Sequence, residues 1–205
     1  MDNMDFDFVS IPLVSTEAPD FTATAVMPDN SFNDKFKLSD YRGKYVVLFF
    51  YPLDFTFVCP SEIIAFDKQL EEFKSRGVEV IGVSTDSHFS HWAWKNTDVN
   101  NGGIGNIQYP LVADFQKIIS QDYGLLLDGG MALRGTFLID KDGVVQHSTI
   151  NNLGLGRNID EMLRMIDALQ HLEEHGEVCP ANWTKGDDAM APTAEGVAKY
   201  LSDHK

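Results

Sequence analysis

The stretch YVVLFFY at residues 45–51 decides the fold. It is continuous, apolar and rich in β-branched and aromatic residues, which is typical of a strand buried on both faces of a sheet. Pro60 then stands where the first turn of a helix tolerates proline, and Gly77 ends that helix. Between them, apolar residues recur at helical spacing, at Ile63, Phe66, Leu70 and Phe73. Residues 78–83 predict a second buried strand, which completes a strand–helix–strand unit.

Shorter signals flank this unit. Residues 21–36 carry alternating apolar pieces around a Pro-Asp-Asn turn, which predicts a small hairpin. Residues 135–139 and 144–150 predict two strands joined by a tight turn, and residues 159–169 predict an amphipathic helix that ends at Gly176. Strands that alternate with helices imply parallel crossovers, and the closing hairpin adds an antiparallel pair. We therefore predict an α/β fold, a thioredoxin-like three-layer sandwich with a mixed central sheet.

Length and composition fit one core with an extension. The 205 residues are 43% apolar, which is enough to build a core without disulfide staples. The residues that follow the last predicted core helix are too many for a frayed end. We predict one domain at residues 1–172 and a C-terminal arm at residues 173–205.

The charge balance excludes several classes of partner. Acidic residues number 31 against 16 basic ones, a formal net charge of −15, so the surface repels nucleic acids and anionic membranes. The longest apolar stretch, residues 45–53, is too short to span a bilayer. No Lys or Arg precedes Lys35, so the basic start of a targeting peptide is missing. With only two cysteines, these features predict a cytoplasmic protein in a reducing compartment.

Cys59 is the first candidate for chemistry. It falls between the buried strand and the start of the helix, where unpaired backbone N–H groups and the helix dipole favour a thiolate over a thiol. Thr56, three residues earlier, can place a hydroxyl beside the sulfur, and Pro52 and Pro60 can shield it from bulk water. A buried structural cysteine is the alternative, because free cysteines are among the most buried residues.

A family resemblance favours the reactive cysteine. Pro52, Thr56 and Cys59 match the Pro-x-x-x-Thr-x-x-Cys signature of the peroxiredoxins, and Arg134 matches the arginine of their active site. The resemblance runs from about Ala18 to the C-terminus. Within the family, the sequence most resembles the typical two-cysteine class, in the group of bacterial alkyl hydroperoxide reductase C. It implies a thiol peroxidase that reduces hydrogen peroxide and organic hydroperoxides.

The resemblance also implies roles for the residues around the sulfur. Attack of a thiolate on a peroxide moves negative charge onto the departing oxygen and leaves a sulfenic acid on Cys59. Thr56 and the helix N–H groups are expected to hold the substrate oxygens, while Arg134 supports the thiolate and the developing charge. Glu62 and Arg157 match the family positions that brace Arg134; for Arg157, an exposed cap or a surface ion pair is the alternative.

Cys179, in the predicted arm, is either an idle surface thiol or the partner of Cys59. The segment Glu-Val-Cys-Pro around it, followed by Trp183, resembles the resolving segment of the family. The resemblance implies that Cys179 of one subunit attacks the Cys59 sulfenic acid of the other subunit of a homodimer. Because a disulfide needs close contact of the sulfurs, both segments are expected to unwind locally.

The same resemblance extends to assembly and recycling. It implies homodimers that assemble into a ring, and a dithiol reductant that is either thioredoxin or a flavoprotein disulfide reductase. It calls for no metal and no bound cofactor. Two alternative functions remain at this point, a redox-regulated holdase chaperone built from large assemblies and a peroxide-sensing redox relay.

Other motifs have ordinary explanations or a secondary role. His171 and His175 fit a His-x-x-Glu-His zinc pattern, but they stand at a helix end where the dipole favours histidine. His88 and His91 are explained by a solvated and a packing face of a short helix. The loop at residues 102–105 and the C-terminal Tyr-Leu pair resemble two clamps that slow unwinding in peroxide-sensitive family members.

Overall fold

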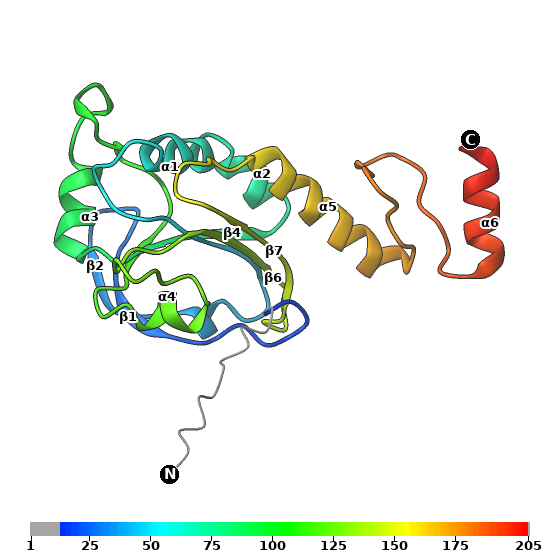
Figure 1. Cartoon of the computed structure of the whole chain (residues 1–205), viewed down its shortest axis with the longest axis horizontal. Coiled ribbons are helices and arrows are strands. Elements are labelled where there is room, and N and C mark those ends of the chain that lie inside the picture. Colours follow the sequence, from blue (N-terminus) through cyan, green and yellow to red (C-terminus); the bar gives the residue numbers. More distant parts are fainter. Residues whose placement is uncertain (1–12, 205) are drawn as a thin grey trace, which may run out of the picture.

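The apolar run forms the central strand β3 (Tyr45–Phe50), in which every residue is buried. Successive side chains enter two separate clusters on opposite faces of the sheet, with Val47 and Phe49 in one and Leu48 and Phe50 in the other. The computed structural model describes residues 13–204. Figure 1 shows the sheet between helical layers, with an arm that extends from it at the C-terminal end.

The sheet has seven strands in the order β2-β1-β5-β4-β3-β6-β7. Besides β3, its strands are β1 (Thr22–Val26), β2 (Phe32–Lys37), β4 (Val78–Ser84), β5 (Leu111–Ala113), β6 (Arg134–Ile139) and β7 (Val145–Asn151). β4 is parallel to both β3 and β5, and the other pairs are antiparallel. The predicted mixed sheet and both predicted hairpins are therefore confirmed.

Helices cover both faces of the sheet, as the three-layer prediction requires. Residues of α1 (Cys59–Lys68), α2 (Leu70–Ser75) and α5 (Ile159–His175) pack in the cluster that contains Phe49. The short helix α4 (Ile118–Asp122) packs in the opposite cluster. The remaining helices are the 3-10 helices Leu38–Tyr41 and Val99–Asn101, α3 (His88–Lys95) and α6 (Ala194–Asp203). In Figure 1, α1, α2 and α5 lie over one face of the sheet and α4 lies over the other.

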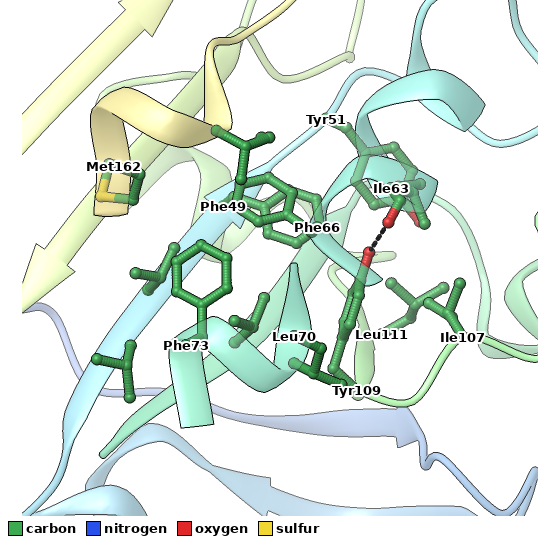
Figure 2. Close-up of a cluster of buried hydrophobic side chains, with 14 of the residues drawn as sticks. Phe49, Tyr51, Ile63, Phe66, Leu70, Phe73, Ile107, Tyr109, Leu111 and Met162 are labelled. Carbon is green, nitrogen blue, oxygen red and sulfur yellow. Dashed lines mark hydrogen bonds between the residues drawn. The ribbon is translucent and has the colours of Figure 1, made fainter. Parts of the chain in front are cut away.

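A stacked aromatic pair fixes α1 against the sheet. The rings of Phe49 and Phe66 are 4.3 Å apart and nearly parallel, and Tyr109 meets Phe49 edge-on at 5.8 Å. Figure 2 shows these rings in one cluster beneath α1. Gly82 on β4 is required there, because a Cβ at this position would lie 2.9 Å from the Phe49 ring. The helix that carries Cys59 is therefore seated on a rigid core.

Two details of the helices and strands differ from the sequence expectation, and the end of α5 agrees with it. The single helix predicted up to Gly77 is divided at Gln69, whose backbone leaves the helical conformation (φ −97°, ψ 5°). Strand β5 was not predicted, since three residues are too few to show alternation. α5 continues to His175 and ends at Gly176, whose φ of +69° is the left-handed helix end expected of glycine. The helix thus ends where the sequence predicted. The division into a domain at residues 1–172 and an arm at residues 173–205 stays a prediction, and the start of that domain lies outside the described residues.

The arm has a small packed centre of its own. Val178 pairs with Met190 in an antiparallel bridge, and Trp183 between them is 2% exposed. The Trp183 ring lies 5.0 Å from the ring of His171 on α5, and its carbonyl accepts a hydrogen bond from Arg164. The segment that contains Cys179 is therefore held on the second half of α5.

Candidate active site

Cys59 is the first residue of α1 and follows a loop that leaves β3. Its side chain is fully buried. The hydroxyl oxygen of Thr56 lies 3.0 Å from the sulfur and 2.8 Å from the carbonyl oxygen of Leu53. Pro52 is buried at the start of the loop. The sulfur thus occupies a dry position at a helix N-terminus, with one hydroxyl beside it.

Arg134 approaches the same sulfur from β6. Its Nη1 atom lies 3.3 Å from the Cys59 sulfur, and its Nε atom donates to the carbonyl of Leu153. Glu62, one turn along α1 from Cys59, binds Arg134 through one carboxylate oxygen. Both oxygens of Glu62 are also bound by Arg157, at 3.0 Å each. The structure therefore brings these four side chains into one buried cluster.

Arg157 acts as the brace of this cluster. Its side chain is 3% exposed, and its Nη1 atom donates to the carbonyls of Phe50 and Gly135. These contacts tie the ends of β3 and β6 to Glu62. Burial lowers the pKa of the Arg157 guanidinium, an effect that the Glu62 carboxylate opposes. The surface alternative considered for Arg157 is wrong.

The cluster has an excess of positive charge. Two guanidinium groups, of Arg134 and Arg157, face the single carboxylate of Glu62 within the buried site. One of these guanidinium groups, that of Arg134, also faces the Cys59 sulfur at 3.3 Å. The arrangement can therefore stabilise negative charge that develops beside the sulfur during a reaction.

A buried network below the loop was missed by the sequence analysis. His91 is fully buried, and its Nδ1 atom lies 2.8 Å from a carboxylate oxygen of Asp54. The Tyr51 hydroxyl donates to the other oxygen of Asp54, and the Asp54 amide donates to Asp86. These bonds fix the loop between β3 and α1. The available signal was the spacing of His91 and the buried Trp94, which share one face of α3.

Cys179 lies on the arm and not in the cluster around Cys59. Its sulfur is 3.6 Å from the carbonyl oxygen of Ala168 on α5, and both cysteines are free thiols. Burial raises the pKa of Cys179 above its ordinary value, while the positive charge of Arg164 opposes this shift.

The remaining histidine pair belongs to the packing of the arm. A ring nitrogen of His171 lies 3.2 Å from a carboxylate oxygen of Glu177, and the ring packs against that of Trp183 at an angle of 47°. Among residues 13–204, no three His, Cys, Asp or Glu side chains are grouped as a metal site would need. Within the same range, none of the helices has the length and apolar character that crossing a membrane requires.

The chain is similar to known proteins along most of its length. The AhpC/TSA family matches residues 14–148, and the C-terminal domain of 1-Cys peroxiredoxin matches residues 168–203. Alkyl hydroperoxide reductase C of Helicobacter pylori strain J99 is 58% identical over 193 residues, which cover 94% of this chain and 98% of that protein. The mitochondrial thioredoxin-dependent peroxide reductase of Drosophila melanogaster is 55% identical over 194 residues, which cover 93% of this chain and 82% of that protein.

A solved structure shows the same similarity in its fold. The reduced 2-Cys peroxiredoxin of Plasmodium vivax superposes with a TM-score of 0.91 at 56% sequence identity, and the match covers 93% of this chain and 98% of that one. The resemblance stated from the sequence is thereby confirmed. The chain belongs to the AhpC/TSA family and is a peroxiredoxin, a thiol peroxidase that reduces hydroperoxides.

Proposed function

We propose that Cys59 is the peroxidatic nucleophile of this peroxidase. Its thiolate attacks one oxygen of the peroxide, the O–O bond breaks, and the other oxygen leaves with the electron pair and is protonated to water or an alcohol. Cys59 is left as a sulfenic acid. The observation that carries the proposal is the position of the sulfur, 3.0 Å from Thr56 and 3.3 Å from Arg134 in a site with excess positive charge.

We infer that Thr56 and Arg134 also hold the substrate. Thr56 is half-buried and its hydroxyl lies 3.0 Å from the sulfur, where it can bond the attacked oxygen. The Nη2 atom of Arg134 has no hydrogen-bond partner among residues 13–204, so it can donate to the oxygen on which charge develops. Pro52 closes the pocket and contributes no backbone N–H.

We propose that Cys179 of a second subunit resolves the sulfenic acid. Its sulfur attacks the sulfenic sulfur, which forms the disulfide and releases water. Two observations support a bond between subunits. The arm extends beyond the C-terminal end of α5, away from α1 of its own chain (Figure 1), and the similar Plasmodium vivax protein is named a 2-Cys peroxiredoxin. The unit of function is then a homodimer, and we propose rings of such dimers as the larger assembly.

A dithiol protein completes the cycle by reducing the Cys59–Cys179 disulfide back to two thiols. We favour thioredoxin over a flavoprotein disulfide reductase, because the similar Drosophila protein is named thioredoxin-dependent. A cytoplasmic location suits a chain whose two cysteines are both free thiols. The comparisons do not favour the holdase and the relay, since these similar proteins are named as peroxide reductases.

The test is peroxide consumption by purified variants with thioredoxin and its reductase. Cys59→Ser should abolish consumption. Cys179→Ser should consume one peroxide per site, retain a sulfenic acid and then stop. Oxidised wild type should run as a covalent dimer on a non-reducing gel, and an oxidised chain that runs as a monomer would exclude the bond between subunits.

A further inference from the structure

One buried hydrogen bond joins the core to the second turn of α1. The hydroxyl of Tyr109 donates to the backbone carbonyl of Ile63 at 2.7 Å, and Tyr109 is 2% exposed. Figure 2 shows the Tyr109 side chain rising from the loop before β5 to this carbonyl, with the bond dashed. Carbonyls inside a helix already accept a bond from the amide four residues later. Tyr109 is therefore a second donor to Ile63, and helix formation alone does not require it.

This bond lies where the contacts that hold α1 change from polar to apolar. The first turn, from Cys59 to Glu62, is held through polar contacts of its side chains with Thr56, Arg134 and Arg157. From Ile63 onward the helix is held by apolar packing, since Ile63 is fully buried and Phe66 stacks on Phe49. Tyr109 bonds the first residue of the part that is packed.

The proposed disulfide step requires that the first turn of α1 can open while the rest of the helix stays in place. The Cys59 sulfur is fully buried, whereas bonded sulfurs lie about 2 Å apart, so the first turn must open before Cys59 can meet Cys179. Opening removes the carbonyls of residues 59–62 as acceptors, and the amides of residues 63–66 lose their partners. The amide of Asp67 is the first whose acceptor, the Ile63 carbonyl, lies outside the opened turn.

We propose that Tyr109 is a positioning residue that stops the opening of α1 at Ile63. By holding the Ile63 carbonyl in its helical orientation, the hydroxyl preserves the acceptor of the Asp67 amide while the preceding turn is extended. The helix then opens far enough to release Cys59 and no further. This inference rests on the proposed disulfide between Cys59 and Cys179.

The experiment is amide hydrogen exchange at single-residue resolution on the full-length protein, reduced and after oxidation to the covalent dimer. In oxidised wild type, the amides of residues 63–66 should lose protection while that of Asp67 keeps it. Tyr109→Phe deletes only the hydroxyl. It should raise exchange at Asp67 about tenfold in the oxidised protein, the equilibrium factor for a typical buried hydrogen bond. In the reduced protein, where the first turn is intact, the change should be much smaller.

Tyr123→Phe is the matched control. Tyr123 is 3% exposed, and its hydroxyl donates to the carbonyl of Pro19 at 3.0 Å on the other face of the sheet. This variant loses a comparable bond, but exchange at Asp67 should not respond to oxidation any more than in wild type. An oxidation-dependent rise specific to Tyr109→Phe would support the proposal, because a general loss of stability would appear in both variants and both redox states.

Two results would overturn the proposal. They differ in whether the proposed disulfide between Cys59 and Cys179 is contradicted as well. If the covalent dimer forms but Asp67 loses protection in wild type, or is unaffected by Tyr109→Phe, the opening is not limited at Ile63 and the disulfide step stands. If peroxide yields no covalent dimer, the disulfide step itself fails, and the role of Tyr109 fails with it.

Discussion

The Nη1 atom of Arg134 lies 2.5 Å from a carboxylate oxygen of Glu62, and the same nitrogen is 3.3 Å from the sulfur of Cys59. The carboxylate therefore fixes the direction from which Arg134 faces the sulfur. Glu62 is fixed in turn by Arg157, which binds both of its oxygens. Since Glu62 is on the same helix as Cys59, this link connects the geometry of the site with the winding of α1.

Glu62→Gln tests this link. The substitution leaves two buried guanidinium groups without a carboxylate and should lower the free energy of unfolding by about 3 kcal/mol. Misplacement of Arg134 should also reduce the rate constant for peroxide reduction about a hundredfold. The control is Glu161→Gln, which breaks a more exposed pair with Arg164 and should cost under about 1 kcal/mol. Chemical denaturation and stopped-flow kinetics measure the two effects, and equal losses in both variants would contradict the assignment.

Thr56→Val should reduce the rate constant for peroxide reduction about a hundredfold or more, because it removes the hydroxyl 3.0 Å from the sulfur and keeps the shape of the side chain. Thr56→Ser retains the hydroxyl and should recover most of the rate. Both variants should unfold at nearly the same denaturant concentration as wild type. A Thr56→Val variant with wild-type kinetics would remove Thr56 from the site.

Cys179 should react slowly with alkylating agents at neutral pH. Burial raises the pKa of this thiol, so the thiolate forms at higher pH in the folded protein than in the unfolded chain. In Cys59→Ser, where Cys179 is the single cysteine, the midpoint of the alkylation rate against pH should therefore lie higher without urea than in urea. Coincident midpoints would show that the arm does not desolvate the sulfur.

Lys95 should make stability rise with pH at alkaline values. Its side chain is 2% exposed and donates to the Met27 carbonyl, and burial lowers its pKa from 10.5 to about 8. Below pH 8 the folded protein bears the penalty of a buried charge. Between pH 8 and 10.5 the unfolded chain binds more protons, so the penalty is relieved by up to about 3 kcal/mol.

The measurement for Lys95 is the free energy of unfolding against pH in wild type and in Lys95→Met. The difference between them should move in favour of wild type from pH 8 to 10.5. Lys199→Met, at a side chain that is 81% exposed, should show no such trend. A pH-independent difference for Lys95→Met would mean that Lys95 is not desolvated.

Deleting residues from Pro192 onward should make the enzyme more resistant to inactivation by peroxide. The deletion removes α6, which buries none of its residues in its own chain and exposes Val197 and Leu201. If α6 packs over the first turn of α1 in a partner subunit, its loss speeds opening, so the disulfide forms before a second peroxide oxidises the sulfenic acid. Mass spectrometry of sulfinic Cys59 across a peroxide series measures this, and unchanged yields would show that α6 is not a clamp.

Local signals in the sequence were sufficient for much of the fold. The run at residues 45–51 predicted β3, because a strand buried on both faces has no polar positions. The placement of Cys59 in a first helical turn followed from Pro60 and the apolar spacing after it. These features depend on residues close together in the chain, so a single sequence displays them.

Features that depend on distant residues were not visible. The break at Gln69 is not marked by glycine or proline, and its side chain bonds Asp160 on α5. The burial of His91 depends on Asp54 and on the carbonyl of Val112, which the fold brings together from separate segments. The role of Glu62 came from the family resemblance, because no local pattern shows that one carboxylate will bind two arginines of other elements.

The packing of α1 on the core also affects how fast the first turn of α1 can rewind after it has opened. Starting a helix in free chain is slow and unfavourable, because several residues must be fixed before the first bond forms. Here Ile63 and Phe66 keep a wound segment in place on Phe49 and Tyr109, so closing the site requires only growth from an existing nucleus. Elongation takes on the order of nanoseconds per residue. We therefore expect that rewinding of α1 after reduction of the proposed disulfide is too fast to limit turnover.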